Sequence, residues 1–186
     1  MTHSQDARKE IVTVCARLYE RKLIAGLEGN VSIRLGTNRI IITPAGVNKG
    51  FLTPDMLVET DLAGQVISTG VPSGEIHIHR AVYQHQPTAK AIVHAHPTHC
   101  VALSLAGISL EEPIIPELVA TMGRIPTVSY TTPQTEALAQ AIAKNLRNDT
   151  TAVILERHGS ITMGDNLFEA FDRLDMLEHA ASIIWK

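Results

Sequence analysis

The sequence has few cysteines, few aromatic residues, no excess of positive charge and no long apolar run. The two cysteines, Cys15 and Cys100, are too few for a disulfide framework or for a zinc site of cysteines alone. A formal net charge of −3 gives no electrostatic basis for binding nucleic acid. No apolar run approaches the roughly 20 residues of a membrane span, and residues 1–10 contain no apolar signal core. We therefore expect a soluble, cytoplasmic protein that binds neither nucleic acid nor a membrane.

Histidine, by contrast, is plentiful. The 186 residues include nine histidines but only one Trp, three Tyr and three Phe. Imidazole is the commonest metal ligand in proteins, so the composition directs attention to metal sites. The length is typical of one domain, and neither an internal repeat nor a long linker interrupts the chain. We predict a single domain over residues 1–186.

Helical and extended patterns interleave along the chain. Apolar residues recur at helical spacing over 4–22 and alternate over 31–35, where a turn leads into a second predicted strand over 39–43. This hairpin excludes an all-parallel sheet, so we predict a mixed, mostly antiparallel sheet between helices, an α/β fold. The other predicted elements are a helix beginning at Thr53–Pro54, helices over 73–87, 98–106, 132–147 and from 166 onward, and strands over 91–96, 125–130 and 153–156, the last continuing through 161–163. The last helix is expected to start at Asn166, because Glu169 follows three residues later at the spacing of a capping box.

Three histidines stand at the ends of predicted strands. His94 and His96 are two residues apart, so in a strand their side chains project from one face and can reach one ion. His158 ends another strand and precedes Gly159, a residue that permits a sharp turn or a close approach of the backbone. If the two strands are neighbours, the three imidazoles converge and leave one coordination position open, as in catalytic zinc sites. The alternative is that His94 and His96 merely lie on a polar face.

A second pair of histidines has the same spacing but a different predicted setting. His77 and His79 lie in a predicted helix, where their side chains point about 200° apart. We therefore expect that they do not share a metal. His79 is expected to pack in the core or to form hydrogen bonds.

Glu75 follows Ser73 and Gly74 at the start of the same predicted helix. A carboxylate in the first turn of a helix interacts favourably with the helix dipole, and that structural role alone can explain it. Gly29–Asn30 and Ala45–Gly46 flank the predicted hairpin and can present backbone N–H groups to an anion. Taken singly, these two pairs are equally well explained as turns.

Five short segments carry a resemblance to a known family. They are Gly29 to Arg34, Ile42 to Gly46, Pro72 to Glu75, His94 to Pro97 and Arg157 to Gly159. In this order and spacing they resemble the class II aldolase/adducin family, over nearly the whole chain. The short length and the segment Leu177 to Ala181 are most similar to those of compact L-fuculose-phosphate aldolases. A single motif would be weak, whereas five in succession are specific.

The resemblance implies a fold, a cofactor and an assembly. The fold is a three-layer α/β/α sandwich, and the assembly is a homotetramer with active sites between subunits. The cofactor is one Zn²⁺ per subunit, although three imidazoles also suit other divalent ions. Glu75 is the implied acid/base residue beside the metal. The implied metal ligands are His94, His96 and His158, and the implied binding residues for the phosphate group of the substrate are Asn30, Ala45, Gly46, Ser73 and Gly74.

The implied reaction is aldol cleavage of a ketose 1-phosphate similar to L-fuculose 1-phosphate. It releases dihydroxyacetone phosphate and an aldehyde through an enediolate, with zinc polarising the carbonyl and Glu75 moving protons at the neighbouring carbon. The chain departs from the family where Ala45 and Gly74 replace hydroxyl residues, which removes side-chain donors but keeps backbone N–H groups. Tyrosines of well-studied members also lack a visible counterpart. Glu117 lies in one such region, either as a substitute proton donor or as an ordinary loop residue after Pro116.

Other members of the family give alternative functions. Ribulose-phosphate 4-epimerases use the same zinc site but rely on an aspartate where this chain has Val119, which counts against that reading. Glu117 is compatible with a methylthioribulose-phosphate dehydratase, and a decarboxylase of phosphorylated oxo-acids is a further alternative. The adducin head domain resembles the fold as a non-catalytic binding module, but it lacks the metal ligands that this chain has. We therefore place a metal-dependent aldolase first.

Overall fold

The fold is built on one mixed β-sheet. The computed structural model describes residues 2–111 and 115–186. Within them, the strands lie in the order β3-β2-β1-β4-β7-β6-β5, and neighbouring strands are antiparallel except for the parallel pair β5 and β6. The strands are β1 (Asn30–Leu35), β2 (Arg39–Ile42), β3 (Val58–Asp61), β4 (Ala91–Ala95), β5 (Thr127–Val128), β6 (Ala152–Leu155) and β7 (Gly159–Gly164).

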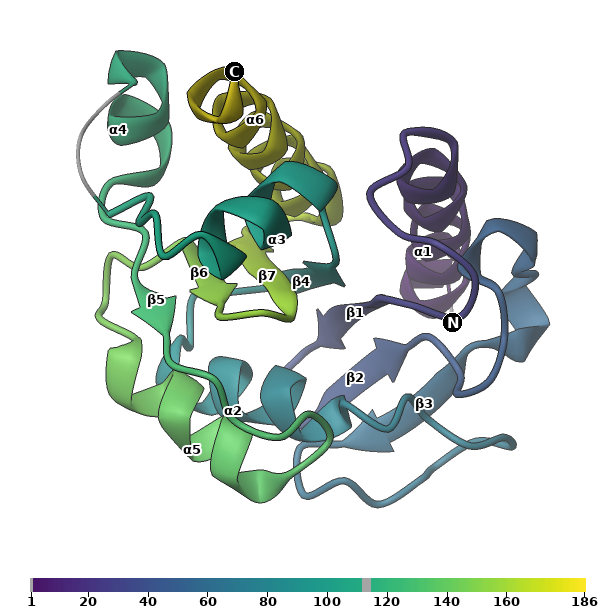
Figure 1. Cartoon of the computed structure of the whole chain (residues 1–186). Helices are drawn as coiled ribbons and strands as arrows, with labels where there is room; N and C mark the ends of the chain where they lie inside the picture. Colours follow the sequence, from purple (N-terminus) through teal and green to yellow (C-terminus); the bar gives the residue numbers. More distant parts are fainter. Residues whose placement is uncertain (1, 112–114) are drawn as a thin grey trace.

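Helices cover both faces of this sheet (Figure 1). On one face, α1 and α6 lie against the central strands and α3 and α4 pack beside α6, whereas α2 and α5 pack together on the other face. The predicted sandwich with a mostly antiparallel sheet is therefore confirmed. The helices are α1 (Thr2–Glu20), α2 (Ile76–His85), α3 (Thr98–Leu105), α4 (Pro116–Met122), α5 (Glu136–Asn145) and α6 (Leu167–Trp185), with short 3₁₀ turns η1 (Lys49–Phe51) and η2 (Pro54–Met56). None of the described helices is long and apolar enough to cross a membrane.

Alternation along the strands divides the core between the two faces of the sheet. In β4, Ala91, Val93 and Ala95 pack into the apolar cluster formed with α1 and α6. Ile92 belongs instead to the cluster formed with α2 and α5. His94 therefore points to the face that carries α2. Alternate residues of β4 therefore pack into the core on one face of the sheet, while His94 lies on the opposite face.

The start of α6 follows the predicted capping pattern. The side chain of Asn166 accepts a hydrogen bond from the backbone N of Glu169 at 2.9 Å. The carboxylate of Glu169 in turn accepts from the backbone N of Asp165 at 2.7 Å. These reciprocal bonds satisfy N–H groups that have no partner within the helix, which is why the sequence signal was sufficient here.

The predicted helix at Thr53–Pro54 is wrong. Only the three residues of η2 form there, and Thr53 makes no capping hydrogen bond. Leu57 and Val58 follow immediately, are buried, and lead the chain into β3, which the sequence analysis did not predict. Burial of these two side chains in the sheet therefore prevails over the local signal for a helix start. The short helix α4 was also not predicted.

The predicted start of the helix at 132 is wrong by one turn. Thr135, not Thr132, is the N-cap of α5, and its hydroxyl accepts a hydrogen bond from the backbone N of Leu138 at 3.3 Å. The helix cannot begin earlier because Gln134 has a positive φ of 61°, which is incompatible with a right-handed helix.

The predicted continuation of one strand from 153 through 163 is also wrong. Strands β6 and β7 are separate and antiparallel, and a tight turn joins them, in which the backbone N of His158 donates to the carbonyl of Leu155 at 3.1 Å. Arg157 takes a positive φ of 59° in this turn. Gly159 follows and packs against the end of β4. A Cβ at Gly159 would overlap the carbonyl oxygen of Ala95 and lie 2.8 Å from Cδ2 of His96.

This close approach predicts a steric effect of Gly159→Ala. We expect the added methyl group to lower the free energy of unfolding by about 1–3 kcal/mol through overpacking and to displace His96, measured by chemical denaturation and by zinc titration. The control is Gly36→Ala, at a positive φ with open space around it. It should cost about 1–2 kcal/mol from backbone strain without weakening zinc binding. Equal zinc affinity in both variants would contradict the prediction.

Candidate metal centre and active site

Pairing of β4 with β7 brings the three predicted histidines together. His94 lies in β4, His96 directly follows that strand, and His158 lies in the turn that leads into β7. The register places His94 opposite Ile161 and Ala95 opposite Ser160, so the turn ends beside the end of β4. One nitrogen from each histidine lies within 4.8 Å of the other two. The ring centroids are 4.9–5.0 Å apart.

The donor set fits a divalent metal ion. Nδ1 of His94 donates to the carbonyl of Ser160 at 2.9 Å, so Nε2, which lies 3.3 Å from Nε2 of His96, is the nitrogen placed to coordinate a cation. Two nitrogens that each lie about 2.0–2.1 Å from a tetrahedral Zn²⁺ are about 3.4 Å apart. Burial, followed by the neighbouring His94 and His158, lowers the pKa of His96 to about 3. The ring of His96 is therefore neutral at pH 7 and can coordinate a cation.

Glu75 faces the same point from the start of α2. Its Oε2 lies 3.1 Å from Nε2 of His94, and its Oε1 lies 3.3 Å from Nε2 of His158. Burial alone would raise the pKa of this carboxyl, but the charge of His94 and hydrogen bonds from His158, His94 and Asn30 outweigh that effect and hold the pKa well below its usual value. Glu75 is consequently ionised at neutral pH, so it can accept a proton or contact a cation.

A chain of buried hydrogen bonds holds Glu75 in place. Asn30 Nδ2 donates to Glu75 Oε2 at 2.9 Å, and Asn30 Oδ1 contacts Nε2 of His79. Nδ1 of His79 lies 2.7 Å from the hydroxyl of Ser32, which in turn lies 2.9 Å from the hydroxyl of Tyr83. Because the Asn30 oxygen can only accept, Nε2 of His79 carries the proton and its Nδ1 accepts from Ser32.

This arrangement confirms that His77 and His79 point to different surroundings, as expected for a helix. His79 is buried and hydrogen-bonded, whereas His77 is half-exposed and lies 3.5 Å from the exposed carboxylate of Glu136. The two rings do not share a metal site. Glu75, the N-cap of α2, and His79 are four residues apart, the spacing of neighbouring side chains on a helix. That spacing would have linked them from the sequence.

The predicted phosphate-binding residues gather around one cavity of about 540 Å³ beside the histidines. It lies between the loop before β1, the loop after β2 and the turn before α2. A larger hollow of about 810 Å³ beside α1 contains none of the histidines of this cluster, so the chemistry points to the smaller cavity. The sequence-predicted residues that line it are Asn30, Ala45, Gly46, Ser73, Gly74, Glu75, His96 and His158.

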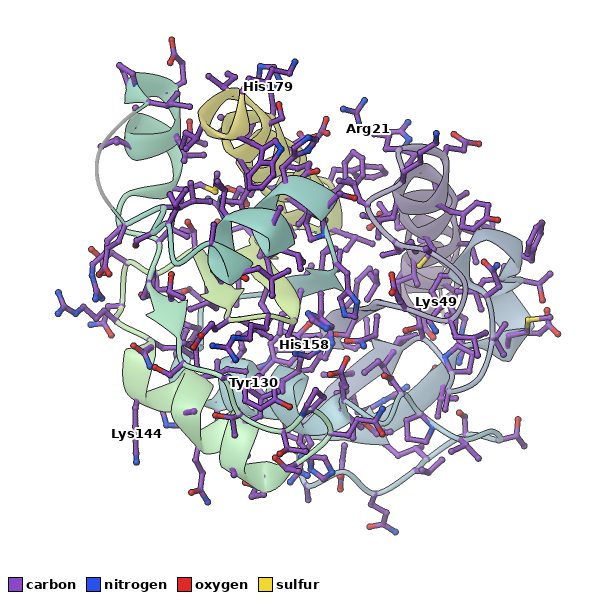
Figure 2. All side chains as sticks on the ribbon, in the orientation of Figure 1. Arg21, Lys49, Tyr130, Lys144, His158 and His179 are labelled. Atoms are coloured by element: carbon purple, nitrogen blue, oxygen red, sulfur yellow. The ribbon has the colours of Figure 1, made fainter. Side chains whose placement is uncertain are left out.

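Lys49 and Gln134 are among the lining residues that were not predicted from the sequence. Lys49 is 3% exposed, and its Nζ donates to the carbonyls of Leu27 at 2.9 Å and Val47 at 2.8 Å. It therefore ties the loop before β1 to the loop after β2. Figure 2 shows Lys49 and His158 toward the middle of the molecule, whereas His179 lies at the periphery. No periodic pattern marks a buried lysine in a short 3₁₀ turn, so the sequence offered no signal for it.

Glu117 is not brought to the cavity of its own chain. It is exposed in the first turn of α4. It lines neither the cavity described above nor an adjoining cavity of about 640 Å³, which lies on the other side of His96 and His158 and is lined also by Lys22 and Arg157. Its role as a proton donor therefore stays a prediction.

Comparison with known proteins identifies relatives over the whole length of the chain. Residues 9–185 match the family described as "Class II Aldolase and Adducin N-terminal domain". A 3-oxo-tetronate 4-phosphate decarboxylase of Pectobacterium atrosepticum is 34% identical over 189 residues, covering 100% of this chain and 86% of the relative. An L-fuculose phosphate aldolase of Methanococcus maripaludis is 34% identical over 174 residues, covering 94% of this chain and 93% of the relative.

Solved structures agree with this assignment. The structure of YgbL from Klebsiella pneumoniae superimposes with a TM-score of 0.92 and 36% identity, covering 98% of this chain and 89% of that protein. The similarity therefore includes the sheet, both helical layers and the turns that carry the histidines. A relative named as a decarboxylase and a relative named as an aldolase are thus equally similar to this chain, each at 34% identity.

Convergence of three imidazoles predicts a metal site that depends on each of them. Mutation of a residue that only hydrogen-bonds a metal ligand weakens metal binding by roughly 10–100-fold. We expect His158→Ala to weaken Zn²⁺ binding by more than this, because one of the three protein ligands is lost. Competitive titration with a chromophoric chelator measures this affinity. His179→Ala is the matched control, since His179 is exposed in α6. Zinc binding by His158→Ala with the affinity of the unmodified protein would contradict the site.

Burial of His79 predicts a pH-dependent stability. Burial, with a smaller effect of His94, lowers the pKa of His79 from 6.5 to about 3. Between these values the unfolded chain binds more protons than the folded chain, so the free energy of unfolding falls as the pH falls below about 6.5. We expect the stability difference between the unmodified protein and His79→Gln to shrink from pH 7.5 to pH 4.5.

The stability measurement needs a second histidine variant as reference. Both proteins are unfolded with urea in the presence of a chelator, so that loss of metal does not contribute to the change. His85→Gln, at an exposed position at the end of α2, should keep a constant difference from the unmodified protein over the same pH range. A constant difference for His79→Gln as well would show that His79 titrates normally in the folded protein.

Proposed function

The chain belongs to the class II aldolase and adducin N-terminal domain family, and from this premise we propose that it is a metal-dependent lyase that cleaves a carbon–carbon bond of a sugar phosphate. The observation that carries the proposal is the convergence of three imidazoles and the ionised carboxylate of Glu75 beside one cavity. Oε2 of Glu75 lies 3.1 Å from Nε2 of His94, so an ionised proton acceptor stands directly beside the proposed metal.

The reaction that we place first is aldol cleavage of a ketose 1-phosphate similar to L-fuculose 1-phosphate. Its C3–C4 bond breaks as the C4 hydroxyl loses a proton, so that C4 becomes an aldehyde. The bonding electrons stay on the fragment with the C2 carbonyl as an enediolate, and a proton added at C3 gives dihydroxyacetone phosphate. The enzyme therefore has to stabilise negative charge beside a carbonyl and to move one proton at a defined carbon.

His94, His96 and His158 would hold the divalent ion, which we propose to be Zn²⁺. The bound ion supplies a Lewis acid for the carbonyl, which lowers the energy of the negative charge next to it. Glu75 holds and returns the proton at the carbon beside the carbonyl, because it is ionised and faces the site. Asn30 fixes the orientation of this carboxylate through its Nδ2.

The other end of the cavity suits the phosphate group. Gly46 and Gly74 line the cavity in the two turns, where they can offer backbone N–H groups to an anion, and the hydroxyl of Ser73 adds a donor. Lys49 is the only Lys or Arg among the described residues that line the cavity, and its charge favours an anionic substrate. We propose that these groups bind the phosphate ester, with the carbonyl directed to the histidines.

Decarboxylation is the second candidate, and a relative aligned with the entire chain supports it. A 3-oxo-tetronate 4-phosphate has a carboxylate at C1, a hydroxyl at C2, a ketone at C3 and a phosphate ester at C4. Loss of CO₂ from C1 leaves the same enediolate as aldol cleavage, and a proton at C2 gives dihydroxyacetone phosphate again. The two candidates therefore share one intermediate and one product and differ only in the group that leaves.

We further propose the homotetramer that the family resemblance implied, with active sites between subunits. Glu117 is exposed and lies outside the cavity of its own chain, a placement that suits a proton donor to a neighbouring subunit. Analytical ultracentrifugation tests the assembly. A dilution-dependent loss of activity together with dissociation supports shared sites, and full activity of a monomer would overturn them.

The proposed chemistry predicts that release of dihydroxyacetone phosphate depends on Glu75. Zinc-loaded protein is given L-fuculose 1-phosphate or 3-oxo-tetronate 4-phosphate, and the common product is measured with a coupled dehydrogenase. We expect release from at least one substrate, and a decrease in kcat of roughly 10²–10⁴-fold in Glu75→Gln, because general acid–base catalysis is lost. Glu136→Gln, at an exposed position in α5, is the control and should retain full activity.

The identity of the second product separates the two candidates. Formation of L-lactaldehyde from the first substrate supports aldol cleavage, and enzyme-dependent CO₂ from the second supports decarboxylation. Absence of dihydroxyacetone phosphate with both substrates, from protein that holds one zinc per chain, would contradict the proposal.

A further inference from the structure

Gln134 has an unusual backbone conformation beside the cavity. Its φ of 61° lies in the left-handed region, which among the described non-glycine residues occurs only at Lys22, Gln134 and Arg157. All three line the two cavities on either side of the histidines. A side chain in this conformation costs free energy that glycine would avoid, and such strain clusters at functional sites. The side chain of Gln134 is therefore expected to have a use there.

The carboxamide of Gln134 lies against Gly74. A Cβ built on Gly74 would be 2.8 Å from Oε1 and 3.0 Å from Cδ of Gln134. Any side chain at position 74 would therefore have to displace the carboxamide. No other residue that the structure describes forms a hydrogen bond with this carboxamide, so it is free to bind a ligand in the cavity.

Side-chain donors are few around the carboxamide, and the hydroxyl of Ser73 is one of them. Ala45, Gly46 and Gly74 line the same cavity and offer only backbone groups. The ammonium group of Lys49 uses two of its three donors on the carbonyls of Leu27 and Val47. An amide NH₂ provides two donors, which is what an oxyanion at this position requires.

We propose that Gln134 binds the phosphate group of the substrate and that Gly74 is required to make room for the Gln134 side chain. The two residues then determine together how tightly the phosphate group is bound. The proposal rests on the phosphate end of the proposed function, but not on which carbon–carbon bond is cleaved. Gln134 donates from its NH₂ to a phosphate oxygen above the Ser73–Gly74 turn. The left-handed backbone directs the side chain back over this turn instead of outward.

Inorganic phosphate is the probe, because its binding can be measured without turnover. Its dissociation constant is determined by calorimetry on the metal-loaded protein, and its inhibition constant is determined wherever a substrate is turned over. We expect Gln134→Gly to weaken phosphate binding roughly tenfold, the effect of losing one charge-assisted hydrogen bond. The melting temperature should stay equal or rise, because the backbone strain is relieved. A lower affinity then cannot be attributed to unfolding.

Two further single variants separate a phosphate contact from a merely structural role. Gln134→Glu has the same shape but places a carboxylate against the phosphate, so it should bind phosphate more weakly than Gln134→Gly. Gln140→Ala, at an exposed position in α5, is the control and should bind phosphate normally. An effect of Gln134→Glu no larger than that of Gln134→Gly would overturn the contact.

A double variant tests whether Gly74 and Gln134 act together. Gly74→Ser alone should weaken phosphate binding, because the new side chain displaces the carboxamide. In the double variant Gly74→Ser/Gln134→Gly the serine has space and supplies a hydroxyl donor, so affinity should return to within about threefold of the unmodified protein, far from the additive loss of independent sites. Additive losses, or phosphate binding unchanged in Gln134→Gly, would overturn the inference.

The outcomes for this pair and for the proposed function are distinguishable. Turnover of a sugar phosphate with unchanged phosphate binding in Gln134→Gly would overturn the role of Gln134 and leave the lyase intact. Phosphate binding that depends on Gln134 in a protein that cleaves neither substrate would support the pair and contradict the lyase. Among variants that are turned over, the effect of Gln134→Gly should fall on KM more than on kcat.

Discussion

The antiparallel pairing of β4 with β7 is the constraint on which the candidate active site depends. It sets His94 and His96, at the end of one strand, against the turn that carries His158. The same register supplies the carbonyl of Ser160 that orients the ring of His94. Gly159 allows the approach, because a side chain there would overlap the end of β4. The three histidines come from distant parts of the sequence, and backbone hydrogen bonds thus fix the candidate metal centre that they form.

The carboxylate beside this centre is held by a second, buried system. Glu75, Asn30 and His79 form a continuous set of hydrogen bonds that ends at Ser32 and Tyr83. Buried polar groups are costly unless they are paired, so each member restricts the orientation of the next. Because β1 pairs with β4 and places Asn30 opposite His94, the histidine cluster and Glu75 are held by the same framework of strands.

The sequence predicted which side chains converge better than it predicted the connections around them. Spacing alone placed His94 and His96 on one face, and the Asn166–Glu169 pattern correctly located the start of α6. The β6–β7 turn was missed because Arg157 takes a backbone conformation that its residue type does not indicate. Lys49 and Gln134 were missed for a related reason, since their positions follow from tertiary contacts between loops. The phosphate-binding residues and Glu117 have a position in the structure, but their roles stay predictions.

The central claim, that Glu75 and the metal centre form an enediolate from dihydroxyacetone phosphate, can be tested without knowing the other substrate or product. Metal-loaded protein is incubated with dihydroxyacetone phosphate in D₂O, and exchange at the free hydroxymethyl carbon is followed by proton NMR. The account predicts that one of the two hydrogens exchanges, because Glu75 approaches a single face of the enediolate, and that Glu75→Gln and metal-free protein exchange neither. No exchange by the metal-loaded protein, or equal exchange in Glu75→Gln, would contradict it.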